Sequence, residues 1–522
     1  MDKDVLMVLK GELAEMMIQI APQVYRKYVT VDKKGTKLLY VKLQKALYGL
    51  MRANLLFYRK LQKEFKAYGL QVNPYNPCMA NMETKSRKQL TVIWHVDDLM
   101  ALCEDNFKLT KFLCYLGKTY GTKLSMHTGQ KYEYLGMDME FNKDGMLEVL
   151  MITYLKNVIE QFPEEISGKA SSPAAEHLFA VRDKSKARVL EEERASAFHH
   201  MVAQLLFMCT RAQQDIQMAF AFLTTRVKSP DKDNWGKLKR VLKYLNGTKY
   251  LKLRLSMENV GMLKWYVDGS HNVHPDCRGH GGALFSMGKG ATTSYSRKLK
   301  LNTQSLMESE LVMADMYMPE MLWSLYFIQA QGYEAKCVGL NQDNISTQLL
   351  IKNRWMSSGK RTKHIKAKFF FIKDRVDKGE IKVMDCLTKE MWADVLTKPL
   401  QGMAFQTMRA ELMNCPVNYK DPAEDTEEQE RKATKHGLKG RSRSTSWKLV
   451  TRKREVTSPF KTPQECVGHS GTFKAGNGTT DRCLVGDSYP QGHVRLKNRY
   501  STWNVRRGRE YGSQNSHFNM LI

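Results

Sequence analysis

The sequence predicts a multidomain protein that combines α/β and α+β folds and ends in a largely disordered, basic tail. Three observations predict this architecture. The chain has 522 residues, which is enough for about three domains of ordinary size. Hydrophobic residues make up 42% of it, too many for a wholly disordered chain. Strand-like runs alternate with helical patterns as far as residue 415, and this periodicity is lost beyond that point.

We expect four regions along the chain. Residues 1–165 mix strands and helices, residues 166–257 are mainly helical, and residues 258–415 have an α/β pattern. Residues 416–522 begin with a short acidic linker and continue as the basic tail. The tail is rich in Gly, Ser, Thr and Arg, a composition that buries too little apolar surface to offset the entropy of the chain.

The charge of the chain indicates its class of partner. Lys and Arg number 82 against 54 Asp and Glu, a net charge of +28. Residues 431–522 hold 19 of these basic residues and 5 of the acidic ones, a net of +14. Such an excess favours a polyanionic partner, and nucleic acid is the first to test. The tail is either a nucleic-acid-binding arm or a solvated extension, and its composition does not decide between them.

The compartment and the absence of a membrane partner follow from composition. The mean hydropathy is −0.48, and no apolar run approaches the roughly 20 residues of a membrane-spanning helix. We expect no signal peptide, because no apolar core follows the charged residues after Met1. The ten cysteines form no Cys-x-x-Cys pair, which is typical of a reducing compartment. We expect an intracellular protein of the cytoplasm or nucleus.

Two adjacent aspartates stand between apolar, strand-like runs. Residues 91–96 and 99–102 flank Asp97 and Asp98, which predicts a β-hairpin with both acids at its turn. Adjacent carboxylates repel one another unless a cation neutralises them, and two-metal phosphoryl transfer uses such pairs. The alternative is an ordinary turn in which the two side chains cap the backbone.

The middle of the chain reads as three helices, over residues 198–208, 215–225 and 234–245. In the third, Leu and Val side chains share one face, and basic residues that include Lys237 and Arg240 fall on the others. This basic face is either a solvated surface or a contact for a nucleic-acid backbone. We interpret His199 and the histidine after it as a helix start.

From residue 262 onward the pattern is three strands, a long helix over residues 304–331, a strand, two helices, a strand and a helix. The predicted strands span residues 262–267, 282–287, 292–297, 337–341 and 381–384. Four acids fall at the edges of elements or on the long helix: Asp268, Glu310, Asp343 and Asp394. On the long helix, Glu310 shares a stripe with apolar residues and Glu308 does not. A charge on an apolar face needs a counterion, which favours Glu310 as a metal ligand.

Histidine and cysteine recur at three-residue steps in one loop. His271, His274, Cys277 and His280 have residue types that zinc accepts. The stretch contains Pro275 and joins two strands, so we favour an ordinary loop.

Several motifs resemble the reverse transcriptase and RNase H domains of copia-type long-terminal-repeat retrotransposons. They are the Leu-Tyr-Gly-Leu box at 47–50, the Val-Asp-Asp hairpin at 96–98, the Tyr-Leu-Gly run at 134–136 and the Ala-Asp-x-Leu-Thr-Lys-Pro-Leu box at 393–400. We expect the Tyr-Leu-Gly run to lie within a single strand over residues 132–141. The resemblance covers roughly residues 1–415.

The resemblance implies a domain for each region. Residues 1–165 become a partial, N-terminally truncated reverse transcriptase with fingers and palm. Residues 166–257 become a thumb and connection, and residues 258–415 an RNase H-like domain. The family's polymerase takes a third metal-binding aspartate from a segment upstream of the one that begins here. We therefore do not expect polymerase activity from this chain alone.

The resemblance also implies site residues and ligands. Two-metal Mg²⁺ sites, with Mn²⁺ as a substitute, would use the catalytic acids Asp97 and Asp98 in the palm, and Asp268, Glu310, Asp343 and Asp394 in the RNase H-like domain. Nucleic acid would lie along Tyr134, Leu135, Gly136, Lys237 and Arg240.

The expected activity is cleavage of the RNA strand of an RNA–DNA hybrid. An RNA template, a DNA primer and other products of the same polyprotein are the further expected partners. The alternative is a remnant of a transposable element that binds nucleic acid without catalysis.

Overall fold

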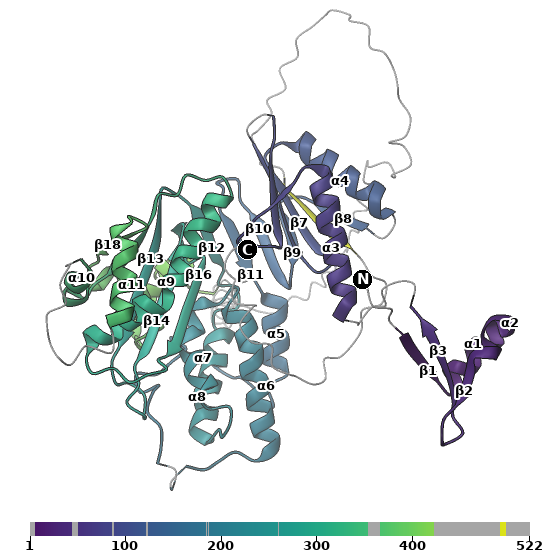
Figure 1. The fold of residues 1–522 in the computed structure, drawn as a ribbon. Coiled ribbons are helices and arrows are strands. Elements are labelled where there is room, and N and C mark those ends of the chain that lie inside the picture. The colour runs from purple at the N-terminus through teal and green to yellow at the C-terminus, as the bar shows by residue number, and fades with distance from the viewer. Residues whose placement is uncertain are drawn as a thin grey trace, which may run out of the picture.

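The computed structural model describes residues 6–43, 51–85, 88–121, 124–183, 185, 187–258, 260–352, 366–421 and 491–496 (Figure 1). Four β-sheets and the helices around them form a mixed α/β protein. The Leu-Tyr-Gly-Leu box lies outside these residues, as do Asp2 and Asp4 near the start of the chain. No described helix is both long enough and apolar enough to cross a membrane.

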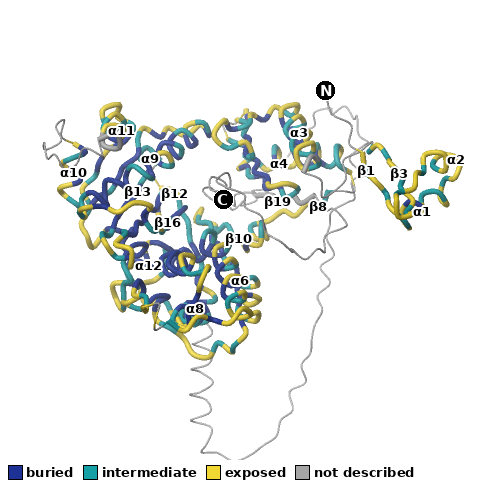
Figure 2. The backbone as a smooth tube through the Cα atoms, turned by 60° about the horizontal axis from the view of Figure 1, so that its bottom comes forward, coloured by how far each residue is buried: buried dark blue, intermediate teal, exposed yellow. Residues whose placement is uncertain are grey.

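The first unit is a small antiparallel sheet with two short helices. Its strands are β1 (Leu6–Lys10), β2 (Val29–Val31) and β3 (Lys37–Lys42), in the order β1-β3-β2. Helices α1 (Glu12–Ile20) and α2 (Pro22–Tyr25) connect the first two strands. Within this unit, Ala14 and Leu39 are the buried apolar residues. Figures 1 and 2 show it standing apart from the rest, with a mostly exposed surface.

The second unit carries the predicted aspartate hairpin. Its sheet has the order β4-β5-β6-β7-β19-β8. The bounds are β4 (Gln71–Val72), β5 (Met79–Glu83), β6 (Gln89–His95), β7 (Asp98–Cys103), β8 (Leu124–Thr128) and β19 (Gln491–Leu496). Helices α3 (Met51–Tyr68) and α4 (Asn106–Tyr120) supply side chains such as Phe65 and Phe112, which pack with Trp94 of β6 in a separate apolar core.

Strand β19 lies within the predicted basic tail. Most of the expected disordered region, residues 422–490 and 497–522, lies outside the described residues. Gln491–Leu496, however, forms a strand that pairs antiparallel with both β7 and β8. This short strand is an exception within a tail that was predicted to be largely disordered, since pairing between distant segments leaves no local pattern in the sequence.

The third sheet has the order β15-β12-β11-β10-β9. Its strands are β9 (Lys131–Tyr134), β10 (Met137–Phe141), β11 (Leu147–Leu150), β12 (Leu253–Met257) and β15 (Gly288–Lys289). A single strand over residues 132–141 was the wrong prediction, since β9 and β10 form an antiparallel hairpin. Leu135 and Gly136 occupy its turn at φ 51° and 75°, the left-handed region that tight hairpins require.

The three predicted helices are present as α6 (Glu192–Cys209), the turn η3 (Gln214–Ile216) with α7 (Gln217–Thr224), and α8 (Lys232–Asn246). Helix α5 (Ile152–Glu160) precedes them and lies before the predicted helical region. The apolar face predicted for α8 is buried, as Leu238 and Leu242 show. The interpretation of His199 as a helix start is wrong, because α6 begins at Glu192.

The fourth sheet has the order β16-β14-β13-β17-β18. Its strands are β13 (Met262–Ser270), β14 (His280–Ser286), β16 (Thr293–Lys298), β17 (Cys337–Gln342) and β18 (Ile381–Asp385). Strand β13 pairs antiparallel with β14 and parallel with β17, which is parallel to β18. All five predicted strands are present. The accompanying helices are α9 (Leu306–Ala330), α10 (Ile345–Lys352), α11 (Lys366–Asp377), η5 (Thr388–Glu390), η6 (Trp392–Leu396) and α12 (Gly402–Met413).

One apolar core joins the helical region to the fourth sheet. Buried side chains of α5 to α8, of the β9–β11 sheet and of the β13–β18 sheet belong to a single cluster, and Figure 2 shows buried residues in both regions. Polar contacts cross the same boundary, since Gln214 donates to the Ala291 carbonyl at 2.8 Å and Gln217 to the Ser294 carbonyl at 3.0 Å. The predicted boundary at residue 257 therefore divides one packed body.

Candidate metal centre

The central carboxylate belongs to strand β13. Asp268 is 2% exposed and pairs in register with Gly282 of β14. The Thr397 hydroxyl donates a hydrogen bond to its Oδ2. A buried carboxylate needs hydrogen bonds or a cation to remain charged, and Thr397 supplies one of these interactions.

Helix α9 supplies the second carboxylate, and the structure distinguishes its two glutamates. Both Glu308 and Glu310 are buried. Glu308 is part of the helix cap, because its backbone N–H donates to Ser305 Oγ at 3.2 Å and its Oε2 accepts from the Gln304 N–H at 2.7 Å. Glu310 faces the sheet, where Gln342 Nε2 donates to its Oε2 at 3.2 Å.

The third carboxylate follows strand β17. Asp343 is half-buried and comes directly after Gln342, the last residue of that strand. Strands β13 and β17 are parallel neighbours, so Asp268 and Asp343 lie at the same edge of the sheet. The Gln342 side chain also accepts from the Asn344 N–H at 3.0 Å, which fixes the turn that presents Asp343.

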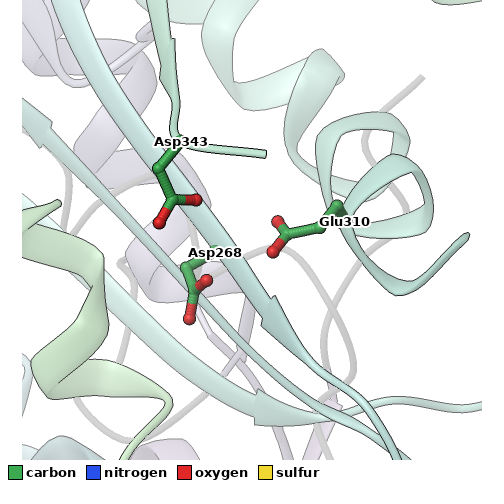
Figure 3. A group of neighbouring side chains, drawn as sticks. All are labelled: Asp268, Glu310 and Asp343. Atoms are coloured by element: carbon green, nitrogen blue, oxygen red, sulfur yellow. The ribbon is translucent and has the colours of Figure 1, made fainter. Parts of the chain in front are cut away.

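These three acids converge on one point (Figure 3). One carboxylate oxygen from each of Asp268, Glu310 and Asp343 lies within 4.8 Å of the other two, and among the described residues no other such group of acids, histidines or cysteines occurs. Oxygen ligands lie about 2.0–2.1 Å from Mg²⁺, and hence within about 4.2 Å of one another. Small side-chain adjustments would close the remaining gap, so the donor set fits a hard divalent cation.

Crowding of negative charge perturbs these groups. Burial, and then the charge of Asp268, raises the pKa of Glu310 well above its ordinary value. The same two causes raise the pKa of Asp343. Carboxylates that resist ionisation when no counterion is present are typical of a cation site.

Asp394 lies beside this group and contacts a lysine. It is buried in η6, where Lys398 Nζ lies 2.6 Å from its Oδ1. Burial and the nearby Asp268 raise the pKa of Asp394 to about 6. The packing of η6 against β14 depends on Gly282, since a Cβ there would lie 2.7 Å from Leu396 Cβ and 2.9 Å from Thr397 Cγ2.

A cavity of about 430 Å³ opens over the acids. Asp268, Glu310, Asp343 and Lys398 contribute to its lining, together with His271 and Asn344. The acids are therefore accessible to a ligand from one side. Sequence reasoning did not identify Gln342, Thr397 or Lys398. Their places in the sequence could have indicated them, since Gln342 directly precedes Asp343, and Thr397 and Lys398 stand three and four residues after Asp394.

The aspartates of the second unit lie at a hairpin tip, as predicted. Strands β6 and β7 pair with His95 opposite Asp98, and Val96 and Asp97 form the connection. Val96 takes φ 54°, a strained conformation for a β-branched residue. Burial and Arg211 lower the pKa of His95, while Asp98 and Asp97 oppose that shift.

Two of the predicted nucleic-acid contacts have side chains that are little exposed. Tyr134 is 1% exposed, so its side chain stabilises the core, whereas Gly136 beyond it is exposed. Burial, and then the charge of Asp98, raises the pKa of Tyr134. The aspartate hairpin and the Tyr-Leu-Gly run therefore lie near one another. The side chain of Lys237 is only 11% exposed and lies 2.9 Å from Asp233 Oδ2.

Lys237 and Arg240 mainly hold a neighbouring segment. Lys237 donates to the Ala180 carbonyl at 2.6 Å, and Arg240 donates to the carbonyl and the hydroxyl of Ser172 at 3.2 and 3.0 Å. They also line a basic cavity of about 400 Å³. Any anion contact there would share these internal bonds, and a nucleic-acid contact of Lys237 and Arg240 stays a prediction.

In the loop with recurring histidines, His274 and His280 form a hydrogen-bonded pair. His274 Nε2 lies 3.0 Å from His280 Nδ1, and His280 Nε2 lies 2.7 Å from Ser296 Oγ. Cys277 is exposed, and His271 instead contacts Thr303 at 3.1 Å. These residues do not converge as ligands, in agreement with the interpretation of an ordinary loop.

The chain resembles several known proteins. It is 26% identical over 402 residues to the retrovirus-related Pol polyprotein from transposon TNT 1-94 of Nicotiana tabacum, a match that covers 76% of this chain and 29% of the relative. The Pol polyprotein from transposon RE2 of Arabidopsis thaliana is 25% identical over 368 residues, 70% of this chain and 24% of the relative. The homologues of this chain are retrovirus-related Pol polyproteins of copia-type transposons. The chain spans less than a third of the length of these Pol relatives.

Yeast relatives and solved structures add to the comparison. The transposon Ty1-LR2 Gag-Pol polyprotein of Saccharomyces cerevisiae is 21% identical over 70% of this chain and 21% of its own length. A foamy viral protease-reverse transcriptase solved in complex with dsDNA is 12% identical, with a TM-score of 0.39 over 69% of this chain and 63% of its own. RNase H1 from Halobacterium salinarum gives 12% identity and a TM-score of 0.19, over 26% and 95% of the two chains. No family profile matches the chain.

Proposed function

We propose that this Pol-related chain acts as a metal-dependent ribonuclease on the RNA strand of RNA–DNA hybrids. The observation that carries the proposal is the convergence of Asp268, Glu310 and Asp343 from a strand, a helix and the end of a second strand. The sheet around them, with order β16-β14-β13-β17-β18, matches the strand and helix order expected of an RNase H-like domain. The transposon Pol relatives support the same interpretation.

The four acids would hold the metal, and neighbouring side chains would keep them in position. Mg²⁺ ions bound by Asp268, Glu310, Asp343 and Asp394, or Mn²⁺ in their place, would supply a polarised water and a counterion for the leaving oxygen. Thr397 orients Asp268, and Gln342 orients Glu310. The cavity beside Asn344 and His271 leaves room for a phosphodiester, and the net charge of +28 favours its approach.

A matched pair of substitutions tests this proposal. Asp343→Asn removes a charged oxygen from the group, so hybrid cleavage in Mg²⁺ should fall by more than about a hundredfold. Asp385→Asn is the control, because Asp385 lies opposite Gln342 on the neighbouring strand β18 and is exposed. Equal activity of the wild type and Asp343→Asn would contradict the proposal. Salt-sensitive hybrid binding without cleavage in any of the proteins would favour the non-catalytic remnant.

RNA-directed DNA polymerase is a second candidate function, favoured by the hairpin tip that carries Asp97 and Asp98. The turn at Leu135 and Gly136 would lie along the primer, with an RNA template opposite. Among the described residues no third acid joins these two aspartates within metal-binding distance. Extension of a DNA primer on an RNA template, lost in Asp98→Asn, is the result that would support polymerase activity. Other products of the same polyprotein would be tested as partners in that assay.

A further inference from the structure

The ammonium group of Lys398 lies within the acidic site. Its Nζ is 2.6 Å from Asp394 Oδ1 and 3.8 Å from Asp268 Oδ1. The backbone holds it there, because the Lys398 N–H donates to the Asp394 carbonyl at 2.8 Å in a helical turn. A positive charge therefore already bridges two of the four acids.

This lysine divides the four acids into two unequal parts. Asp268, Glu310 and Asp343 form a triad whose oxygens are mutually close. Asp394 is outside that triad, and the ammonium group of Lys398 lies between it and Asp268. Asp268 thus contributes to both parts, and its second oxygen is fixed by Thr397. Two adjacent cation positions result: the triad, and the space between Asp268 and Asp394 that Lys398 partly fills.

The side chain of Lys398 is partly exposed and has space to move. Its side chain is 40% exposed, whereas those of Asp268 and Asp394 are 3% and 9% exposed. It lines the mouth of the same cavity as the triad. A lysine carries its charge on a flexible four-carbon stem, so the ammonium can move toward an anion in the cavity while its backbone stays in place.

We propose that Lys398 is a positioning residue that occupies the second cation position of the site and yields it to a divalent ion when a substrate phosphate draws the ammonium away. The inference rests on the proposed ribonuclease function and adds an order of events to it. Without nucleic acid the triad would bind one divalent ion, and the positive charge of Lys398 would oppose a second ion beside Asp394. With substrate, the phosphate would replace the two carboxylates as partner of the ammonium.

Counting Mn²⁺ bound to the full chain without nucleic acid tests this inference. The free ion is measured by electron paramagnetic resonance as MnCl₂ is added. Lys398→Met removes the charge and keeps much of the apolar stem, and Lys398→Arg keeps the charge. Lys389→Met is the control, because Lys389 is exposed in η5 and its loss changes the net charge equally.

We expect one Mn²⁺ in the wild type, Lys398→Arg and Lys389→Met. Lys398→Met should bind a second Mn²⁺ at least roughly tenfold more tightly than the wild type does. Adding Asp394→Asn to Lys398→Met should abolish this second ion, which shows where it binds. A hybrid with a non-cleavable backbone should raise the wild type to two ions.

The failures are distinguishable. One ion with the same affinity in the wild type and in Lys398→Met would overturn the role of Lys398 and leave the proposed function standing. A second ion in Lys389→Met would also overturn it, because the effect would then be general electrostatics. No bound Mn²⁺ in any of the proteins would overturn both the inference and the proposed function.

Discussion

At the scale of the residue, two glutamates on one helix have opposite roles. Glu308 and Glu310 are both buried on α9. Glu308 accepts from a backbone N–H in the helix cap, an interaction that stabilises a carboxylate and the helix together. Glu310 faces Asp268 and Asp343, whose charges and the surrounding burial raise its pKa. Glu308 therefore stabilises the fold, whereas the buried charge of Glu310 lowers the stability of the metal-free protein.

This difference predicts opposite changes in stability for the same substitution. Glu310→Gln removes a charge that its surroundings disfavour, and should increase the free energy of unfolding of the metal-free protein by about 1–2 kcal/mol. Glu308→Gln keeps an acceptor for the helix cap but removes a negative charge from the first turn of α9, and should lower the free energy of unfolding by about 0.3–1 kcal/mol. Urea unfolding in EDTA measures both. A loss of stability in Glu310→Gln would show that its charge is already satisfied without metal.

The raised pKa of Asp394, to about 6, gives a pH dependence. In the folded protein this group binds its proton more tightly than in the unfolded chain. Its contribution to stability is therefore fully present below about pH 4 and is lost as the pH rises through about 6. We expect the metal-free wild type to lose more stability between pH 5 and pH 7 than Asp394→Asn does. Urea unfolding at the two pH values compares them, and equal losses would contradict the expectation.

At the scale of the element, the position of η6 depends on a glycine in the neighbouring strand, because a glycine has no Cβ. Gly282 of β14 lies against Leu396 and Thr397 so closely that a Cβ would displace them. Those two residues stand between Asp394 and Lys398 in the chain. The approach of η6 to the sheet therefore determines how the fourth acid and its lysine meet Asp268.

Gly282→Ala tests that dependence. The added methyl group should push η6 away from Asp268, so that hybrid cleavage falls at least roughly tenfold, with a loss of stability of about 1–3 kcal/mol. Gly236→Ala is the control, because Gly236 lies inside α8 with open space around it. It should retain full cleavage and stabilise the protein by about 0.5–1 kcal/mol. Full cleavage in Gly282→Ala would show that η6 tolerates the shift.

The sequence indicates those elements whose pattern is local. The five strands of the fourth sheet and helix α9 show periodic apolar residues, and their positions agree with the structure. The turn at Leu135 was missed, because a leucine at positive φ gives no signal in the sequence. The cap of Glu308 and the contact of Lys398 with Asp394 need the helical geometry itself. The four acids were predicted from the resemblance and from their places at the edges of elements, and Glu310 also from the apolar face of its helix.

At the scale of the whole molecule, the apolar core shared by the helical region and the fourth sheet, and the net positive charge of the chain, both favour nucleic-acid binding near the acids. The helical region and the acid-bearing sheet form one apolar cluster, so Lys237 and Arg240 on α8 are held in a fixed relation to the acids. The net charge of +28 favours nucleic acid near this body, whatever its sequence.

Hybrid binding should accordingly be sensitive to salt. We expect the affinity of the full chain for an RNA–DNA hybrid, measured by fluorescence anisotropy in EDTA, to fall at least roughly tenfold between about 50 and 200 mM salt. Asp343→Asn should bind with the same or slightly higher affinity, because it removes a negative charge from the site. Affinity independent of salt would contradict binding through the phosphate backbone.

The most direct test of the central claim is to give the full chain the same sequence as an RNA–DNA hybrid, as single-stranded RNA and as a DNA duplex. Each RNA or DNA strand carries an end label, and each reaction contains Mg²⁺ or EDTA. The acidic site predicts cleavage of the RNA strand of the hybrid alone, only with Mg²⁺, and its loss in Asp343→Asn. A hybrid left intact by the wild type in Mg²⁺ and in Mn²⁺ would contradict the assignment of Asp268, Glu310, Asp343 and Asp394 as a ribonuclease site.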